Sequence, residues 1–215
     1  MKNTIIILFF FFAAFLQGQK NIYESNRFDE LTEEHEILAI IPFVTQLELD
    51  NAESKEKLRQ LAEREGYAVQ NALETYFSRR KKRKKFNVDF QNVENTNALL
   101  AKEGITYSDL DIYTTKQLCK ILKVDGIISG SLDLNILLSK GVPTNFTFLD
   151  YFSESNYGRI GIKISDGETG KLLWKYEKSI TKKTGKDTDE VIDKMMKAAS
   201  RKFPYDKERR RKRKN

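Results

Sequence analysis

The chain contains very little of the chemistry that metal centres and nucleophilic active sites require. Its 215 residues include one cysteine, Cys119, and one histidine, His35. A single cysteine cannot form a disulfide within the chain, and a cysteine–histidine metal cluster is excluded as well. No histidine lies near Cys119 in the sequence to activate its thiol, so we interpret it as a buried structural residue. We expect no enzyme, no cofactor and no metal.

Short catalytic motifs are missing too. The segment 129–131 reads Ser-Gly-Ser, but Ile127 stands where a nucleophile elbow has its first glycine. No glycine-rich phosphate-binding loop with Lys-Ser or Lys-Thr is present. Asp125, Asp133 and Asp166 fall at expected strand ends and turns, where aspartate usually accepts backbone hydrogen bonds. A hydrolase built from carboxylates alone is the alternative left open.

The excess of positive charge is confined to the end of the chain. The net charge is +7, and residues 201–215 hold nine Lys or Arg against two Asp or Glu. Residues 1–200 hold 29 of each sign, so they are neutral. A neutral folded part argues against nucleic-acid binding across its surface. We expect residues 206–215 to form a disordered basic tail.

The first 18 residues have the pattern of a secretory signal peptide. Lys2 gives a positive start, residues 4–16 are apolar, and Gly18 offers a small residue at a plausible cleavage point. The apolar run is shorter than the roughly 20 residues that span a bilayer, although an uncleaved membrane anchor is the alternative. No cysteine follows it for acylation. We expect an exported protein, periplasmic or outer-membrane-associated, that is not a lipoprotein.

The stretch 121–134 indicates the fold class. A helix end carrying Lys123 leads through an Asp-Gly turn into a short apolar run, which Gly130 interrupts. A helix that feeds directly into a buried strand is a unit of an α/β fold. We therefore expect an α/β domain over residues 37–205, preceded by a lead-in segment, residues 19–36.

Hydrophobic periodicity predicts the remaining elements. Apolar or alternating runs predict strands at 37–44, 86–90, 159–165 and 171–180, with Pro42 at the end or at a bulge of the first. The turn 166–170 joins the last two strands into a C-terminal β-hairpin. Apolar stripes predict helices at 53–78, 92–102, 115–123 and 187–202. The expected order is β-α-β-α-α-β-β-β-α, with a single mixed sheet packed by amphipathic helices.

His35 and the segment 139–157 are two candidates for a binding site. His35 lies among Glu33, Glu34 and Glu36, where a solvated histidine is favoured over a weak metal or proton site. The long segment 139–157 is the candidate partner surface, because loops of this length are usually functional. Its aromatic residues are Phe146, Phe148, Tyr151, Phe152 and Tyr157.

Two basic clusters are candidates for binding an anionic surface such as lipopolysaccharide or phospholipid. Their residues are Arg79, Arg80, Lys81, Lys82, Arg83, Lys84, Lys85, Arg209, Arg210, Arg211, Lys212, Arg213 and Lys214. For the first cluster a local explanation is favoured, since cations stabilise the C-terminal end of a helix dipole. Binding of nucleic acid or of a small-molecule substrate is disfavoured, and self-association is left open.

The order of elements resembles that of a superfamily of bacterial envelope proteins. The resemblance rests on the apolar strand 37–43, on Val-Asp-Gly-Ile-Ile-Ser-Gly-Ser at 124–131, and on the hairpin 164–174. The superfamily includes the curli secretion protein CsgG, the penicillin-binding-protein activator LpoB and the N-terminal domain of TolB. The resemblance implies a non-enzymatic α/β domain that docks onto an envelope protein partner. The N-terminal cysteine that anchors CsgG-like and LpoB-like lipoproteins is missing here.

Overall fold

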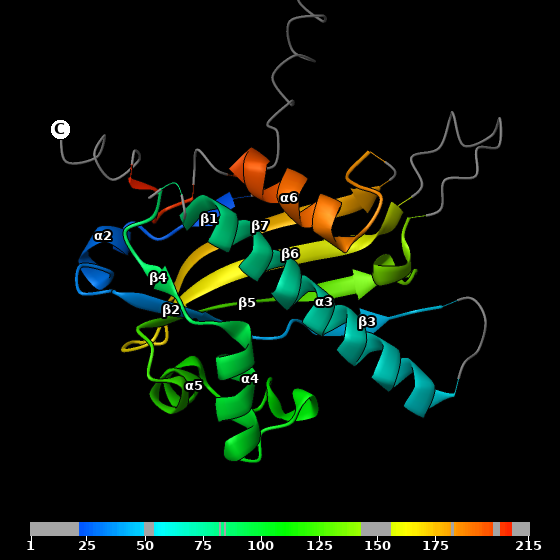
Figure 1. The fold of residues 1–215 in the computed structure, drawn as a ribbon, viewed down its shortest axis with the longest axis horizontal. Coiled ribbons are helices and arrows are strands. Elements are labelled where there is room, and N and C mark those ends of the chain that lie inside the picture. Colours follow the sequence, from blue (N-terminus) through cyan, green and yellow to red (C-terminus); the bar gives the residue numbers. More distant parts are fainter. Residues whose placement is uncertain are drawn as a thin grey trace, which may run out of the picture.

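A computed structural model describes residues 22–49, 54–81, 83, 85–142, 156–181, 183–199 and 203–207 of the chain. Within these residues, seven strands form one mixed sheet against which five α-helices pack (Figure 1). The expected fold class is therefore confirmed. The expected signal peptide, 1–18, lies outside the described residues, as do 209–214 of the basic tail.

The strands are β1 (Ile22–Glu24), β2 (Ile37–Ile40), β3 (Val44–Leu47), β4 (Asp89–Phe90), β5 (Gly126–Leu134), β6 (Asn156–Asp166) and β7 (Leu172–Thr181). The helices are α2 (Phe28–Leu31), α3 (Lys55–Lys81), α4 (Val93–Lys102), α5 (Thr115–Leu122) and α6 (Thr188–Ala199). Two 3-10 turns, η2 (Tyr107–Asp109) and η3 (Leu138–Lys140), complete the described elements. None of the helices in these ranges combines the length and apolarity needed to cross a bilayer.

The sheet has the order β1-β7-β6-β5-β2-β4, and β3 also pairs with β5. β2 and β3 run parallel to β5, whereas β5, β6 and β7 form an antiparallel meander with β1 added at its edge. The apolar run 37–44, expected as one strand, is thus divided between β2 and the start of β3. Both of these short strands pair with β5. Pro42 lies in the break, since it has no N–H to donate to a ladder.

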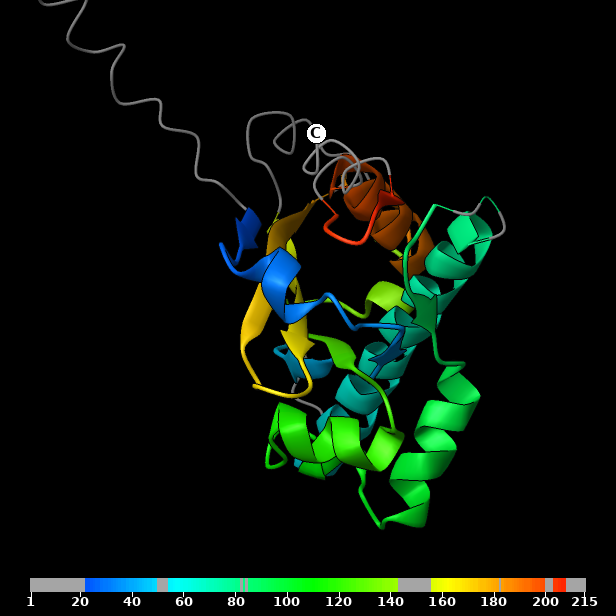
Figure 2. The ribbon, with the colours of Figure 1, turned by 90° about the vertical axis from the view of Figure 1, so that its left-hand side faces the viewer.

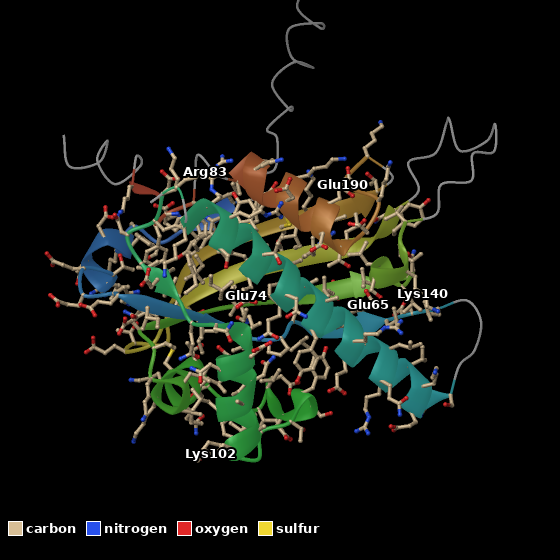
Figure 3. All side chains as sticks on the ribbon, viewed as in Figure 1. Glu65, Glu74, Arg83, Lys102, Lys140 and Glu190 are labelled. Atoms are coloured by element: carbon tan, nitrogen blue, oxygen red, sulfur yellow. The ribbon has the colours of Figure 1, made fainter. Side chains whose placement is uncertain are left out.

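The long helix α3 follows the expected stripe and extends to Lys81. Its buried Glu65 accepts hydrogen bonds from the amide of Ser139 (2.9 Å) and from its hydroxyl (2.5 Å), which fastens η3 to the helix (Figure 3). Gly66 follows, and a Cβ there would lie 2.2 Å from the carbonyl oxygen of Phe43. In the sequence, Gly66 only lowers the stability expected of the helix. The structure explains why a glycine stands there, because the β2–β3 connection passes too close for a side chain.

The two faces of the sheet are covered differently. The main core lies between the sheet and helices α3 and α6, with Trp174, Phe77 and Ile162 among its buried residues. A smaller core forms where α4 and α5 pack on the other face around Ala39 and Ile127. Figure 2 shows α3 and α6 on one side of the strands and α4 and α5 at the lower end.

The segment 22–36 belongs to the fold and is more than a lead-in. β1 pairs with β7 in antiparallel register, and Phe28 of α2 is buried. Phe28 packs edge-on against Tyr205 near the other end of the chain, with ring centroids 5.1 Å apart. Elements from both ends of the domain therefore meet, and the cleft described below lies beside this contact.

Candidate functional site

A cleft of about 670 Å³ opens where three segments that are distant in sequence meet. One wall comes from the α2–β2 connection, the second from α5 and the turn after it, and the third from the β6–β7 turn. Its lining residues are Glu30, Leu31, Glu34, His35, Lys116, Cys119, Lys120, Lys123, Val124, Asp125, Asp166, Gly167, Glu168 and Thr169. The cleft gathers titratable side chains that show no common motif in the sequence.

Helix α5 supplies the basic wall of the cleft. It begins after the cap residue Thr114, whose side chain accepts a hydrogen bond from the amide of Gln117 in a capping box. Leu118 and Leu122 bury one side of the helix in the smaller core. Lys116, Lys120 and Lys123 are spaced by four and three residues, so they share another side of the helix, and all three line the cleft.

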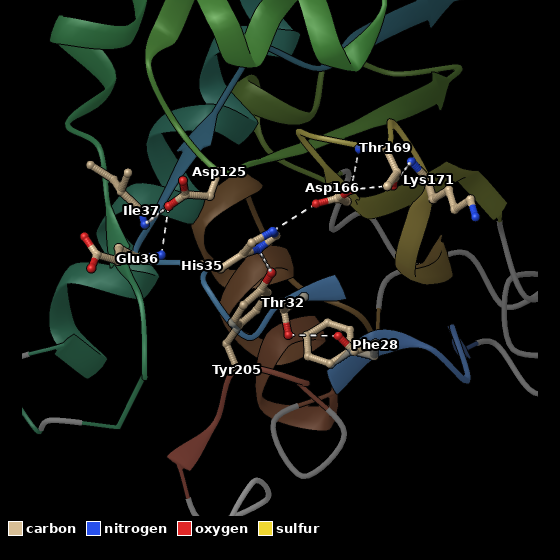
Figure 4. Close-up of polar contacts among 10 residues, drawn as sticks. All are labelled: Phe28, Thr32, His35, Glu36, Ile37, Asp125, Asp166, Thr169, Lys171 and Tyr205. Atoms are coloured by element: carbon tan, nitrogen blue, oxygen red, sulfur yellow. Dashed lines mark hydrogen bonds and ion pairs between the residues drawn. The ribbon is translucent and has the colours of Figure 1, made fainter. Parts of the chain in front are cut away.

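His35 lies at the floor of the cleft with both ring nitrogens engaged (Figure 4). Nδ1 is 2.7 Å from the hydroxyl of Tyr205, and Nε2 is 3.0 Å from Oδ1 of Asp166. The His35 and Asp166 side chains are only 6% and 2% exposed. The expectation that His35 is solvated is therefore wrong, because the strand that follows it carries the ring into the junction of three segments.

The two aspartates of the cleft hold its walls together. The second carboxylate oxygen of Asp166 accepts hydrogen bonds from the amide of Thr169 (2.6 Å) and from its hydroxyl. Burial alone would raise the pKa of Asp166, but the bonds from Thr169 and His35 outweigh it and lower this pKa. Asp125 accepts from the amides of Glu36 and Ile37, both at 2.8 Å. The interpretation of these two aspartates as acceptors of backbone hydrogen bonds is confirmed.

Cys119 borders the cleft as a buried, protonated thiol. Burial, with the negative charges of Asp166 and Asp125, raises its pKa to about 12. Since a thiol is a nucleophile only as the thiolate, Cys119 is inert near neutral pH. The ring nitrogens of His35 bond Tyr205 and Asp166 and are not directed at this thiol. In the described part of the chain, no group of three or more His, Cys, Asp or Glu side chains could hold a metal ion.

The aromatic partner surface expected at 139–157 falls mostly outside the described residues. This applies to Phe146, Phe148, Tyr151 and Phe152. Tyr157 is described: it lies in β6, is half-buried and packs against the main core. Its ring therefore has a structural contact within the domain.

The basic cluster at the end of α3 is partly engaged within the molecule. Arg80 lies 3.6 Å from Asp206 and over the ring of Tyr76, and Lys81 lies 2.9 Å from Asp89. Arg79 donates to the backbone oxygen of Thr75 at 3.3 Å. Lys82, Lys84 and 209–214 lie outside the described residues. Arg79, Arg80 and Lys81 thus have contacts within the molecule, and binding of an anionic surface by the cluster stays a prediction.

Sequence reasoning missed the cleft because its parts come from three segments that are distant in sequence. Tyr205 follows Pro204 near the end of the domain, and nothing in its neighbourhood predicts contact with His35. Lys116, Lys120 and Lys123 do show helical spacing, which predicts that they share one side of α5. That this side borders a cleft follows only from the position of the β6–β7 turn.

No known protein family matches the chain, and no curated protein matches it either. Solved structures with a similar arrangement include lipoprotein GNA1162 from Neisseria meningitidis, at 11% identity and a TM-score of 0.42, covering 68% of this chain and 80% of that one. The C-terminal domain of LpoB from Salmonella enterica is 9% identical with a TM-score of 0.33, over 71% and 91%. A PelC dodecamer subunit from Paraburkholderia phytofirmans is 8% identical with a TM-score of 0.32, over 75% and 89%. TM-scores this low carry no conclusion about function, and the resemblance to CsgG and TolB stays a prediction.

Proposed function

We propose that this protein is an exported, non-enzymatic module that binds a partner protein at the bacterial cell envelope, and that the cleft is its binding site. The signal-like sequence of residues 1–18 supports export. The observation that carries the proposal is a division of roles within the cleft. The groups at its floor bond one another, whereas the three lysines on its basic wall have no ion-pair partner among the described residues.

This division favours binding over catalysis for a chemical reason. A general base needs a ring nitrogen that can reach substrate, and both nitrogens of His35 are occupied. A thiol nucleophile needs a low pKa, and that of Cys119 is raised to about 12. Free ammonium groups around a cleft, in contrast, are suited to recognising a charged partner.

The test places a photo-crosslinking amino acid in the full chain in its native envelope. At Lys120 the probe enters the cleft, and at Phe148 it reports on the aromatic segment. At Lys102, an exposed residue of α4, it lies outside the lining of the cleft (Figure 3). We expect a discrete adduct with one envelope protein from Lys120, identified by mass spectrometry, and none from Lys102.

Three results would count against the proposal. Equal adducts from Lys102 and Lys120 would indicate random collision. An adduct only from Phe148 would move the binding site to the aromatic segment. Absence of adducts from all three positions, with the protein folded and exported, would refute a stable envelope partner.

A further inference from the structure

Lys123 has a backbone conformation that a lysine rarely adopts. It ends α5 with φ 56° and ψ 54°, and within the described ranges it is the one residue other than glycine with positive φ. Glycine is the usual residue at this place in a helix C-terminus, because a Cβ crowds the backbone there. A cation near the helix end is favourable, but Lys120 in the last turn already provides one. A lysine at position 123 therefore needs another reason, and this residue is part of the cleft lining.

Of the other two lysines of the wall, Lys116 lies against the β6–β7 turn. The aliphatic stem of Lys116 lies against Gly170, where a Cβ would come within 3.3 Å of its Cγ. Gly170 itself has φ 72°, so a residue with a side chain would be both strained and crowded. Neither Lys116 nor Lys120 has an ion pair in the part of the chain that the structure describes. The wall thus carries three lysines that have no ion-pair partner among the described residues.

Most carboxylates of the cleft are already engaged by other groups. Asp166 is bonded to His35 and Thr169, Asp125 to two backbone amides, and Glu30 to Arg27 at 2.5 Å. Glu34 and Glu168 remain, without a hydrogen-bond or ion-pair partner among the described residues. They belong to the two walls opposite α5. The cleft therefore offers a row of free cations on one side and two free carboxylates across from it.

We propose that the cleft binds an acidic peptide segment of the partner protein, whose carboxylates pair with Lys116, Lys120 and Lys123 and whose basic flank meets Glu34 and Glu168. This inference rests on the proposed function. From Lys116 to Lys123 the helix rises about 10 Å, which an extended peptide of three residues spans. An acidic peptide therefore matches the row of lysines both in charge and in length.

The same geometry disfavours two other anionic partners. A bilayer surface is flat, whereas the lysines line a recess between three segments. A chain of phosphates would carry negative charge towards Glu34 and Glu168, which would repel it. A peptide with both charge signs satisfies both sides of the cleft.

The probe is a fluorescein-labelled peptide in which Glu and Ser alternate and which ends in Lys, measured by anisotropy with the full chain. Its matched control has Gln in place of each Glu. We expect the acidic peptide to bind and the control not to bind, with affinity falling as ionic strength rises. Lys116→Ala and Lys120→Ala should each weaken binding about threefold to fivefold, the range of an exposed ion pair. Lys102→Ala, on exposed α4, should leave affinity unchanged.

The decisive variant is Lys123→Gly. We expect it to raise the melting temperature by about 2 °C, because strain is relieved, and to weaken peptide binding about fivefold. Lys123→Arg should keep the affinity and gain no stability. If Lys123 had a merely structural role, a substitution that raises the melting temperature would not also weaken peptide binding.

The inference is overturned if Lys123→Gly binds the peptide as well as the wild type does. It is also overturned if the wild type ignores the peptide but binds vesicles of anionic phospholipid through the same lysines. A crosslink from Lys120 to an envelope protein without peptide binding would overturn the acidic-peptide inference and leave the proposed function standing. Absence of crosslinks from all the probe positions would remove the proposed function itself.

Discussion

The ring of Phe43 lies against Gly130 on the neighbouring strand β5. A Cβ on Gly130 would lie 2.3 Å from Cε1 of Phe43 and 1.9 Å from the carbonyl oxygen of Gly161. Phe43 follows Pro42 in the break between β2 and β3. Its ring fills the space that a side chain at Gly130 would occupy, so the two features belong to one packing arrangement. That arrangement lies in the main core beneath α3.

Gly130→Ala should therefore destabilise the protein by about 3 kcal/mol, at the upper end of overpacking costs. The matched control is Gly161→Ala on β6, where an added Cβ meets its nearest atom at 3.5 Å. Urea denaturation should separate the two variants clearly. Equal stability of the two would show that Phe43 and the sheet can shift to accept a methyl group.

The hydrogen bonds of His35 should contribute measurably to stability. Tyr205→Phe keeps the ring against Phe28 but removes the hydroxyl on Nδ1, at an expected cost of about 1 kcal/mol. His35→Ala also leaves a cavity and removes a donor from buried Asp166, so we expect about 3 kcal/mol. Tyr23→Phe, at a position 50% exposed, is the control and should change stability by less than about 0.5 kcal/mol. Equal effects of all three substitutions in urea would contradict the network.

Asp166 should make the domain sensitive to acid. Its pKa is lower in the folded state than in the unfolded chain, so the folded state binds fewer protons at this group. The stability it provides is present above the unfolded pKa of about 4 and is lost as the pH falls through the lower folded value. Unfolding free energies should therefore fall below about pH 4, and Asp166→Asn should flatten that part of the profile. An unchanged acid slope in the variant would assign the effect to other carboxylates.

Cys119 should resist alkylation while the protein is folded. With a pKa of about 12, only a very small fraction of its thiol is ionised at pH 8. Iodoacetamide labelling, followed by mass spectrometry, should be slow in buffer and rapid in denaturant. Rapid labelling of the native protein would show that the thiol is exposed or activated.

Arg80 and Arg83 should differ although both belong to the same basic cluster. Arg80 is 26% exposed, lies near Asp206 and packs over Tyr76, so Arg80→Ala should cost about 1 kcal/mol. Exposed Arg83 has no side-chain contact of this kind among the described residues, and Arg83→Ala should be neutral within about 0.5 kcal/mol. Thermal unfolding of both variants measures the difference. A neutral Arg80→Ala would show that the contacts of Arg80 with Asp206 and Tyr76 contribute nothing measurable to stability.

The sequence by itself determined the α/β class, the long helix, the order of elements from that helix to the last one, and the hairpin. These features follow from hydrophobic periodicity and from local hydrogen bonding, both of which act over a few residues. The roles of Asp125 and Asp166 at turns were predictable for the same reason. The separation of β2 from β3 was only partly predictable, since Pro42 marks the break but not the continued pairing of both strands with β5.

Only the tertiary structure decided the environment of His35 and the existence of the cleft. The partners of His35 are Asp166 and Tyr205, which are 131 and 170 residues away, and no local pattern encodes such contacts. The imidazole of His35 would hydrogen-bond to water in an isolated segment. Because it is buried in the fold, its nitrogens bond to protein groups instead. The lysines of α5 became a wall of the cleft because the sheet brought two other segments opposite them.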